Sequence, residues 1–396
     1  MTGPPDHGGL DAALLERVRQ RVAADGGIPT SARVAAALRA EGGALRGDQD
    51  LLGVLRLLQS ELAGAGPLEP LLQDPSVTDV LVNGPGEVWV DRGRGLERVG
   101  IRFADDTAVR RLAQRLAAPT GRRLDDAQPW VDARLPGGVR LHAVLPPVAP
   151  RGTCLALRVP RRTVFSLDEL VEAGSVPPSG ADLLGDLVGS RLAFVVSGGT
   201  GSGKTTLLSA LLSLADPADR LVLVEDAGEL APDHPHVVRL EARPPNVEGA
   251  GAVTLRDLVR QALRMRPDRL VVGEVRGGEV LDLLAALNTG HEGGCGTVHA
   301  NGAADVPARL EALAAMAGAE RAALHSQLVS GLEVVVHLIR ERPAAGGRRR
   351  LAEVGVIRRG ADGLATVESA WTWDGRGTRG QAGPGAFALA RRMGAA

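Results

Sequence analysis

The hydrophobic positions in the first 62 residues recur with helical spacing. Between residues 14 and 22, leucines and valines lie three and four residues apart and form one apolar stripe. A second helix is expected to begin at Thr30 or Ser31, both good N-terminal caps, and to end at the following Gly-Gly pair. A third apolar segment covers 51–62. The pattern predicts a helical amino-terminal extension over 1–64.

Between residues 65 and 174 the pattern changes to short runs in which apolar and polar residues alternate, as in strands with one buried face. An Arg-Gly-Arg-Gly segment has the composition of a hairpin turn. This region is predicted to be a small α+β domain, followed by a linker at 174–180. Its expected strands are 77–82, 87–91, 131–135, 139–145 and 155–159, with a helix over 108–116.

From residue 181 to residue 374, short apolar runs alternate with amphipathic helices, which is the pattern of a parallel α/β sheet. The run 192–196 is expected to be a buried strand, and 205–214 the helix that follows it. Residues 375–396 are rich in Gly, Arg and Ala and are expected to form a flexible tail. The predicted fold class is α/β, with a smaller α+β domain and a helical extension before it.

Composition narrows the function classes. The 46 basic and 47 acidic residues nearly cancel, which argues against a nucleic acid or a charged membrane as the general partner. No apolar run reaches the ~18–20 residues that span a bilayer, and the first residues lack the pattern of a signal peptide. Cys154 and Cys295 form no Cys-x-x-Cys pair, which fits a reducing compartment. We therefore expect a cytoplasmic protein.

A single lysine stands among the 46 basic residues, and the others are all arginine. It occupies the lysine position of a complete G-x-x-x-x-G-K-[ST] loop, between an expected strand and an expected helix. A loop that wraps β- and γ-phosphates requires a compact ammonium on a flexible stem, and a planar guanidinium has the wrong shape. The predicted nucleotide-binding residues are Gly198, Gly199, Thr200, Gly201, Ser202, Gly203, Lys204, Thr205 and Thr206.

This loop predicts a nucleoside triphosphate, ATP, with Mg²⁺. Backbone amides from Gly199 to Lys204 are expected to form an anion-binding nest, continued by the N-terminus of the next helix. Lys204 would bridge the β- and γ-phosphates, and the Thr205 hydroxyl would bind the metal ion. The alternative is a Gly-rich turn without a ligand, which the strand–loop–helix context disfavours.

Carboxylates end two further expected strands. Glu225 and Asp226 follow the run 221–224, and Glu274 follows the run 269–272. Ligands of open α/β sheets bind beyond the carboxyl ends of the strands, so Glu225 and Glu274 are expected to face the nucleotide. The alternative is a pair of solvated acids at strand ends.

Arginines gather after these strands. Arg256, Arg260 and Arg264 are spaced by four residues and share one helix face, and Arg239 and Arg243 lie just upstream. As unpaired cations beside a triphosphate they would neutralise charge, from a neighbouring subunit if they act as arginine fingers. An ordinary basic helix face is the alternative for each of them.

A Gly-rich stretch over 289–300 carries His291, Cys295 and His299. Zinc is disfavoured because the spacing is not helical and a fourth ligand is missing. Sensing of the nucleotide is the favoured interpretation.

The order and spacing of four blocks resemble the secretion ATPases of type II and type IV systems, in particular the CpaF/TadA-like branch linked to Tad pilus assembly and conjugal transfer. The resemblance covers about 65–345. The blocks are the phosphate loop 198–205, the Asp-box-like 224–230, the atypical Walker B 272–277 with Gly273 in place of the usual Asp, and the His-box-like 289–300, supported by 77–84 and 240–249.

The resemblance implies roles for single residues. Glu225 would be the catalytic glutamate, and Glu274 the Walker B carboxylate near Mg²⁺. His299 would sense the γ-phosphate, and Arg239 or Arg256 would act on it across a subunit boundary. Ala227 stands where many relatives have Thr or Pro, a position whose side chain need not touch phosphate.

The resemblance also implies a fold and an assembly: a PAS-like N-terminal domain on a RecA-like ATPase core, assembled as a homo-hexamer. Nucleotide would lie between the domains, where Arg134, Arg140 or Arg158 could contribute. The extension subgroup of that family carries a tetracysteine zinc motif, and this chain, with 2 cysteines, lacks the residues for one.

The implied function is coupling of ATP hydrolysis to Tad-type pilus assembly, or to secretion or transfer through a membrane complex. Partners would be inner-membrane platform proteins, with peripheral association at the cytoplasmic membrane and no specific nucleic acid. Two alternatives stay open. A DNA motor for conjugation is one, although aromatic residues for single-strand binding make up 2% of the chain. A non-hydrolysing, nucleotide-dependent regulatory scaffold is the other.

Overall fold

The computed structural model describes residues 17, 18, 21, 31–41, 64–93, 95–135, 137–159, 165–243, 245, 250–341 and 347–394. Of the predicted amino-terminal helices, the second is present as α2 (Ser31–Ala40). The predicted helix at 51–62 lies outside the described residues, as does most of the one at 14–22. Within the part that is described, no helix has the length and apolar character to cross a membrane.

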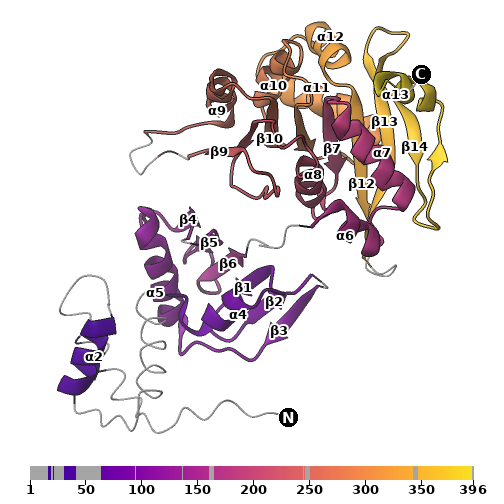
Figure 1. Ribbon diagram of the computed structural model, residues 1–396. Coiled ribbons are helices and arrows are strands. Elements are labelled where there is room, and N and C mark those ends of the chain that lie inside the picture. Colours follow the sequence, from indigo (N-terminus) through magenta and orange to yellow (C-terminus); the bar gives the residue numbers. More distant parts are fainter. Residues whose placement is uncertain are drawn as a thin grey trace. The chain divides into compact units, whose positions relative to one another are not determined.

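Contacts divide the chain into two units, Met1–Arg161 and Arg162–Ala396 (Figure 1). The contacts place the boundary between the units at residues 161 and 162, before the linker that the sequence predicts at 174–180. The reason is that α6 (Leu167–Glu172) and the segment after it already belong to the second unit. Leu167, Leu170 and Val176 are buried in that unit's core.

The first unit is a six-stranded antiparallel sheet in the order β3-β2-β1-β6-β5-β4. In five of its strands, all but β3, alternating side chains are buried together with one face of α5, whose N-terminus is capped by Asp105. The elements are η1 (Gly66–Leu68), α4 (Glu69–Gln73), β1 (Asp79–Val82), β2 (Val88–Asp91), β3 (Leu96–Val99), α5 (Asp106–Ala117), η2 (Ala118–Thr120), β4 (Trp130–Arg134), β5 (Arg140–Val144) and β6 (Cys154–Arg158). The predicted α+β character and the five predicted strands are therefore confirmed, whereas β3 was not predicted.

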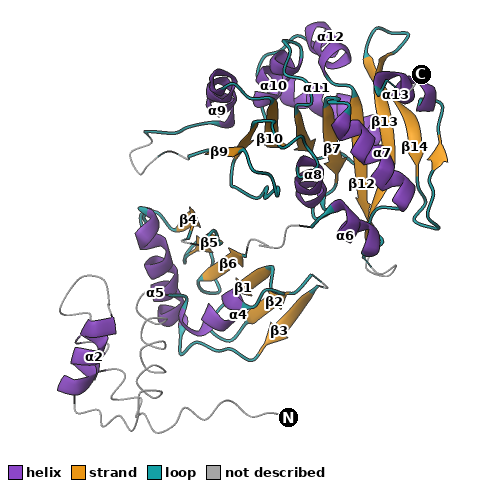
Figure 2. Ribbon diagram, in the orientation of Figure 1, coloured by secondary structure: helices purple, strands orange, loops and turns teal. Residues whose placement is uncertain are grey.

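The second unit contains a nine-stranded mixed sheet in the order β15-β14-β13-β12-β7-β11-β10-β8-β9 (Figure 2). The six strands from β12 to β9 are parallel, so their carboxyl ends meet at one edge of the sheet. The strands are β7 (Phe194–Gly198), β8 (Leu221–Glu225), β9 (Val237–Glu241), β10 (Arg269–Val275), β11 (Cys295–Val298), β12 (Val334–Arg340), β13 (Arg349–Arg359), β14 (Ala365–Thr372) and β15 (Gln381–Ala382).

Helices cover both faces of this sheet, as expected for strands that are apolar on both sides. One face packs against α6, α7 (Pro178–Gly189), α8 (Lys204–Leu212) and α13 (Ala386–Arg392). The other packs against α9 (Leu255–Ala262), α10 (Glu279–Leu287), α11 (Val306–Met316) and α12 (Arg321–Gly331). Short turns η3 (Leu263–Met265) and η4 (Ala303–Asp305) complete the unit.

The predicted flexible tail at 375–396 is instead part of the fold. Strand β15 pairs with β14, and Leu389 of α13 is buried in the core. Arg392 donates to the backbone carbonyls of Glu333 and Ile357, at 2.6 and 2.8 Å. The Gly-rich composition did not reveal this short helix, which Arg392 joins to the backbone of the sheet.

Candidate active site

The phosphate loop lies between β7 and α8, as the sequence predicts. Gly201 and Gly203 have φ angles of 68° and 97°, which side chains with a Cβ rarely adopt. Within the described part of the chain, no side chain caps the N-terminus of α8. Its first amides are therefore open to an anion, which the helix dipole also favours.

Lys204 is the first residue of α8, and its side chain is 7% exposed. Its Nζ donates to the carbonyl oxygens of Gly198, at 3.1 Å, and Gly199, at 3.0 Å. The same nitrogen lies 3.5 Å from Nε2 of His299. Burial lowers the pKa of Lys204, while the negative charge of Glu274 opposes that shift. The ammonium is thus held in the loop by weak neutral acceptors that a phosphate can replace.

Glu225 is the last residue of β8 and is 3% exposed. Its Oε1 accepts hydrogen bonds from the amides of Glu229 and Leu230, at 2.9 and 2.8 Å. Its Oε2 is buried and has no hydrogen-bond partner among the described residues. Burial raises the pKa of Glu225 to about 6, although the two amides and Arg239 lower it. A carboxylate with one fixed and one unpaired oxygen is suited to accept a proton near neutral pH.

Glu274 lies near the end of β10, and His299 directly follows β11. Oε1 of Glu274 lies 2.8 Å from Nε2 of His299, and its Oε2 accepts from Arg276 at 2.5 Å. Although burial raises it, the pKa of Glu274 is lowered overall, chiefly by the bond from Arg276. Burial and Lys204 lower the pKa of His299. The structure therefore brings together Lys204, Glu274 and His299.

Gly273 of β10 lies against Glu225 of β8. A Cβ on Gly273 would lie 2.7 Å from Cγ of Glu225 and 3.2 Å from its Oε1. Strands β8 and β10 are parallel neighbours, so this is a direct contact across the ladder. A side chain at residue 273 would displace the buried glutamate.

The structure corrects one expectation about the arginines, which were predicted to be unpaired cations. Arg256 and Arg260 both bind Asp282 of α10, at 2.7 and 2.9 Å. Arg243 donates to the carbonyl of Gly251, and Arg264 to that of Arg260. Arg256 and Arg260 are thus paired within the chain by an acid of α10 that the sequence pattern did not reveal, and an action of Arg256 across a subunit boundary stays a prediction.

Arg239 is an exposed residue of β9 whose guanidinium donates to the carbonyl of Leu230 in its own chain. Its charge lowers the pKa of Glu225. Arg239 therefore acts on Glu225 of its own chain, and a role across a subunit boundary stays a prediction.

The first unit holds the other predicted arginines. Arg140 donates to both carboxylate oxygens of Asp132, at 3.1 and 2.6 Å, and Arg158 to Asp79 at 3.3 Å. Participation of Arg140 in nucleotide binding stays a prediction.

Three arginines near the phosphate loop were not predicted. Arg276 binds Glu274 and lies 3.8 Å from Asp226. Arg349 donates to the carbonyl of Gly201 at 2.8 Å. Arg340, opposite Arg349 in the β12–β13 ladder, lies 3.1 Å from where a Cβ on Gly201 would be. These arginines lie 72 to 145 residues after Lys204 in the sequence, so no local pattern indicated that they are near the loop.

A pocket of about 550 Å³ lies beside the loop and the His299 segment. It is lined by Gly199, Thr200, His299, Ala300, Asn301, Asp305, Ala308 and Arg309. The pocket adds a cation from α11, Arg309, whose charge lowers the pKa of His299.

Metal binding by the Gly-rich stretch finds no support. In the described ranges no three His, Cys, Asp or Glu side chains are grouped so that they could hold a metal ion. Cys295 is buried, which raises its thiol pKa to about 12, and Nδ1 of His291 lies 3.2 Å from the carbonyl of Ala286. For a metal held mainly by phosphate oxygens, Thr205 and Glu274 are suitable ligands, because one is a hydroxyl in the loop and the other an ionised carboxylate.

Known proteins are similar to this chain over most of its length. A family model described as "Type II/IV secretion system protein" matches residues 61–371. A putative conjugal transfer protein of Mycobacterium tuberculosis is 61% identical over 334 residues, which cover 83% of this chain and 94% of the relative. The probable conjugal transfer protein TrbB of Sinorhizobium fredii is 33% identical, over 75% of this chain and 88% of that protein.

Among solved structures, the ATPase DotB of Yersinia pseudotuberculosis has a similar fold. The TM-score is 0.51 at 17% identity, over 74% of this chain and 79% of that one.

Proposed function

The chain belongs to the type II/IV secretion system protein family, and from that premise we propose that it is an ATP hydrolase that drives transfer through a membrane complex. One observation carries the proposal. The carboxyl ends of β7, β8, β10 and β11 bring the phosphate loop, Glu225, Glu274 and His299 to one edge of the sheet.

Each residue has a chemical task in this proposal. Lys204 exchanges its loop carbonyls for the β- and γ-phosphates, where a charge-assisted hydrogen bond is stronger. Glu225 accepts a proton from the attacking water through Oε2, while its Oε1 stays fixed by two amides. His299 lies 3.5 Å from Nζ of Lys204, so it is near enough to respond to the terminal phosphate.

Two buried oxygens support a ligand at this edge. Oγ of Ser202 and Oε2 of Glu225 have no hydrogen-bond partner among the residues described, and a buried polar atom of this kind costs free energy unless a ligand or water satisfies it. Thr205 and Glu274 would hold Mg²⁺. When bound, this ion neutralises charge on the phosphate oxygens.

The finer parts of the proposal rest on the family resemblance. These are a RecA-like core, a PAS-like amino-terminal domain, a homo-hexamer, nucleotide contacts from Arg140, and association with inner-membrane platform proteins. Assembly of a Tad-type pilus is the leading transport process. The names of the relatives, conjugal transfer protein and type IV secretion system protein, favour conjugal transfer as the second candidate.

The test is ATP turnover by the purified protein with Mg²⁺, separated by size. Lys204→Ala and Glu225→Gln are expected to lower turnover by about 10²–10³-fold, the range seen when one catalytic group is removed. Glu225→Gln should still bind ATP, because the phosphate loop is intact. Glu241→Gln is the matched control, since this exposed carboxylate lies opposite Glu225 on β9.

Turnover that is unchanged in Glu225→Gln would refute the assigned chemistry. ATP binding without turnover above the Lys204→Ala level would favour the regulatory scaffold. Salt-sensitive DNA binding that stimulates turnover would favour a conjugation motor.

A further inference from the structure

An arginine near the phosphate loop holds the carboxylate that the proposed function gives to the metal ion. Arg276 directly follows β10, and its Nη2 donates to Oε2 of Glu274 at 2.5 Å. The other oxygen of Glu274, Oε1, lies 2.8 Å from Nε2 of His299. Both oxygens of the expected metal ligand are therefore occupied by protein groups. None of the roles proposed above uses Arg276.

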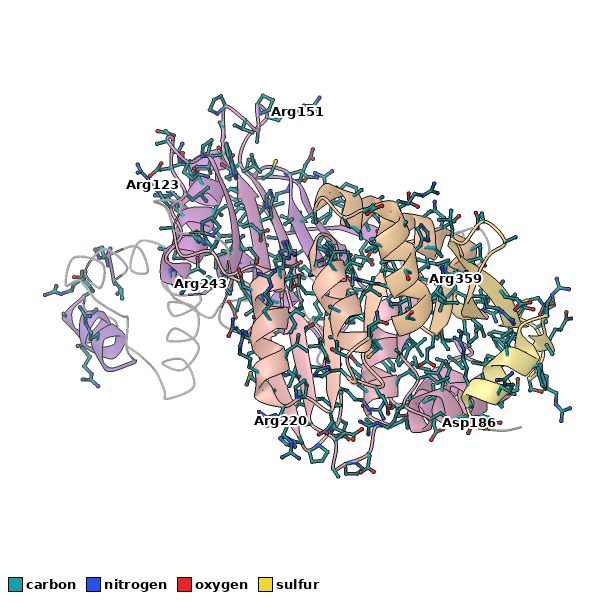
Figure 3. All side chains as sticks on the ribbon, turned by 90° about the horizontal axis from the view of Figure 1, so that it is seen from above. Arg123, Arg151, Asp186, Arg220, Arg243 and Arg359 are labelled. Carbon is teal, nitrogen blue, oxygen red and sulfur yellow. The ribbon has the colours of Figure 1, made fainter. Side chains whose placement is uncertain are left out.

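A second carboxylate lies within reach of the same guanidinium. Nη1 of Arg276 lies 3.8 Å from Oδ2 of Asp226, about 1 Å longer than a charge-assisted hydrogen bond. Asp226 directly follows β8, the parallel neighbour of β10, so both residues lie at the carboxyl edge of the sheet. Figure 3 shows the two edges, with Arg220 before β8 at one and Arg243 after β9 at the other. Arg276 and Asp226 belong to the edge of Arg243.

The backbone of Arg276 is held in place, whereas its side chain is half exposed. The amides of Arg276 and Gly277 donate to Oε1 of the buried Glu279, at 2.5 and 2.7 Å. The side chains of Arg276 and Asp226 are 55% and 44% exposed, so neither is enclosed by packing. Rotation about side-chain bonds can therefore bring the guanidinium onto Asp226 while the start of α10 stays in place.

Ligation of a metal ion by Glu274 competes with its bond to Arg276. A guanidinium is always charged, and a dication on the same carboxylate would repel it at short range. His299 can be neutral and then meets less repulsion. Arg276 also has Asp226 close by as a second partner. Of the two groups bound to Glu274, Arg276 is therefore the one that leaves.

We propose that Arg276 is a positioning residue with two partners: it holds Glu274 in the absence of nucleotide, and it moves to Asp226 when Mg²⁺ and nucleotide bind. The inference rests on the proposed function, which makes Glu274 a metal ligand. It adds that binding of the metal ion is coupled to an exchange of ion pairs between the ends of β10 and β8. Asp226 thereby receives a role that the proposed function does not give it.

Two substitutions are expected to act in opposite directions on metal binding. Arg276→Ala removes the group that competes with Mg²⁺, so the metal ion binds more tightly. Asp226→Asn removes the second partner, so Arg276 stays on Glu274 and the metal ion binds more weakly. In the double variant, Asp226→Asn should have no further effect, because the arginine is absent. This dependence of one substitution on the other distinguishes an exchange of partners from two separate charge effects.

The measurement is equilibrium binding of a fluorescent, non-hydrolysable ATP analogue to the full-length protein, in Mg²⁺ and in EDTA. The dissociation constant in EDTA divided by that in Mg²⁺ gives the contribution of the metal ion. Arg276→Ala is expected to raise this ratio about fivefold and Asp226→Asn to lower it about threefold, within the range of a partly exposed ion pair. Thermal unfolding of each variant without nucleotide checks that it is folded.

Arg358→Ala is the matched control. Arg358 also binds one carboxylate, that of Glu368, at 2.9 Å, and its side chain is 52% exposed. It lies nine residues further along β13 than Arg349, which donates to the phosphate loop, so the two are about 30 Å apart. This variant should keep the wild-type ratio. A change as large as that of Arg276→Ala would show a general charge effect and overturn the inference.

The outcomes separate this inference from the proposed function. If the wild type binds the analogue no more tightly in Mg²⁺ than in EDTA, the proposed metal site fails and the inference fails with it. If Mg²⁺ tightens binding but Arg276→Ala leaves the ratio unchanged or lowers it, the metal site stands and the inference alone is overturned. Additive effects in the double variant would also overturn it, because Asp226 would then act without Arg276.

Discussion

Glu225 and Gly273 occupy adjoining strands at such short range that a Cβ on Gly273 would lie 2.7 Å from Cγ of Glu225. The side chain of Glu225 and any side chain at residue 273 would thus compete for one volume. Here the glutamate fills the volume and the neighbour is glycine. Glu274, the metal ligand in the proposed function, is held nearby by Arg276 and His299.

Gly273→Ala is therefore expected to displace Glu225. Overpacking of this kind costs about 1–3 kcal/mol of stability, and turnover should fall with it because the carboxylate moves. Denaturant unfolding and ATPase assays measure both effects. The control is Gly185→Ala in α7, where a Cβ meets nothing within 4 Å. That variant should be more stable by about 0.5–1 kcal/mol, and equal behaviour of the two variants would contradict the packing argument.

Glu225→Gln is expected to stabilise the protein above neutral pH. The folded pKa of about 6 exceeds the ordinary 4.5, so Glu225 contributes stability below about pH 4.5 that is lost as pH rises through 6. The loss amounts to about 2 kcal/mol at most. Denaturant unfolding at about pH 8 and about pH 4 measures it. If the difference in unfolding free energy between the variant and the wild type is the same at both pH values, ionisation of Glu225 does not destabilise the folded protein.

Turnover should decline in acid because a proton acceptor must be ionised. With a pKa of about 6 for Glu225, kcat is expected to fall by about tenfold for each pH unit below that value. Steady-state rates from about pH 5 to pH 8 at saturating ATP provide the measurement. An acid limb near pH 4.5, the ordinary value of a glutamate, would exclude Glu225 as the controlling group.

Arg239→Ala is expected to move this acid limb upward. The positive charge of Arg239 lowers the pKa of Glu225, so its removal makes the carboxyl harder to ionise. The pH–rate profile of the variant, compared with that of Arg243→Ala, tests the effect. The contrary outcome has two parts. The acid limb would not shift, and mixing Arg239→Ala subunits with Lys204→Ala subunits would restore ATP turnover. Together these results would place Arg239 at the site of a neighbouring subunit.

Arg349→Ala is expected to weaken ATP binding by about tenfold, the effect of losing about 1.4 kcal/mol. Arg349 donates to the carbonyl of Gly201 at 2.8 Å and adds positive charge next to the phosphate loop. Equilibrium binding of a fluorescent ATP analogue measures the change. Arg348→Ala is the control, because this neighbour is an exposed residue outside β13. Equal affinities of the two variants would remove Arg349 from the site.

Much of this could be predicted from short-range sequence patterns. The phosphate loop, the strand-end acids Glu225 and Glu274, and His299 each follow a recognisable strand, and the parallel sheet brings the strand ends together. The pairing of Arg256 with Asp282 could not be predicted, because it joins α9 to α10 across 26 residues. The same holds for His337, whose partner Ser197 is 140 residues away. Contacts between distant segments leave no spacing signal in one sequence.

Lys204 is the one lysine of the chain, and this makes it a unique site for a lysine-specific protease. A protease that cleaves after lysine has a single peptide bond to attack, Lys204–Thr205, inside the first turn of α8. With the side chain 7% exposed, cleavage requires the phosphate loop to unfold locally. The rate at which this protein is cut into two fragments is therefore a direct measure of how often its phosphate loop opens.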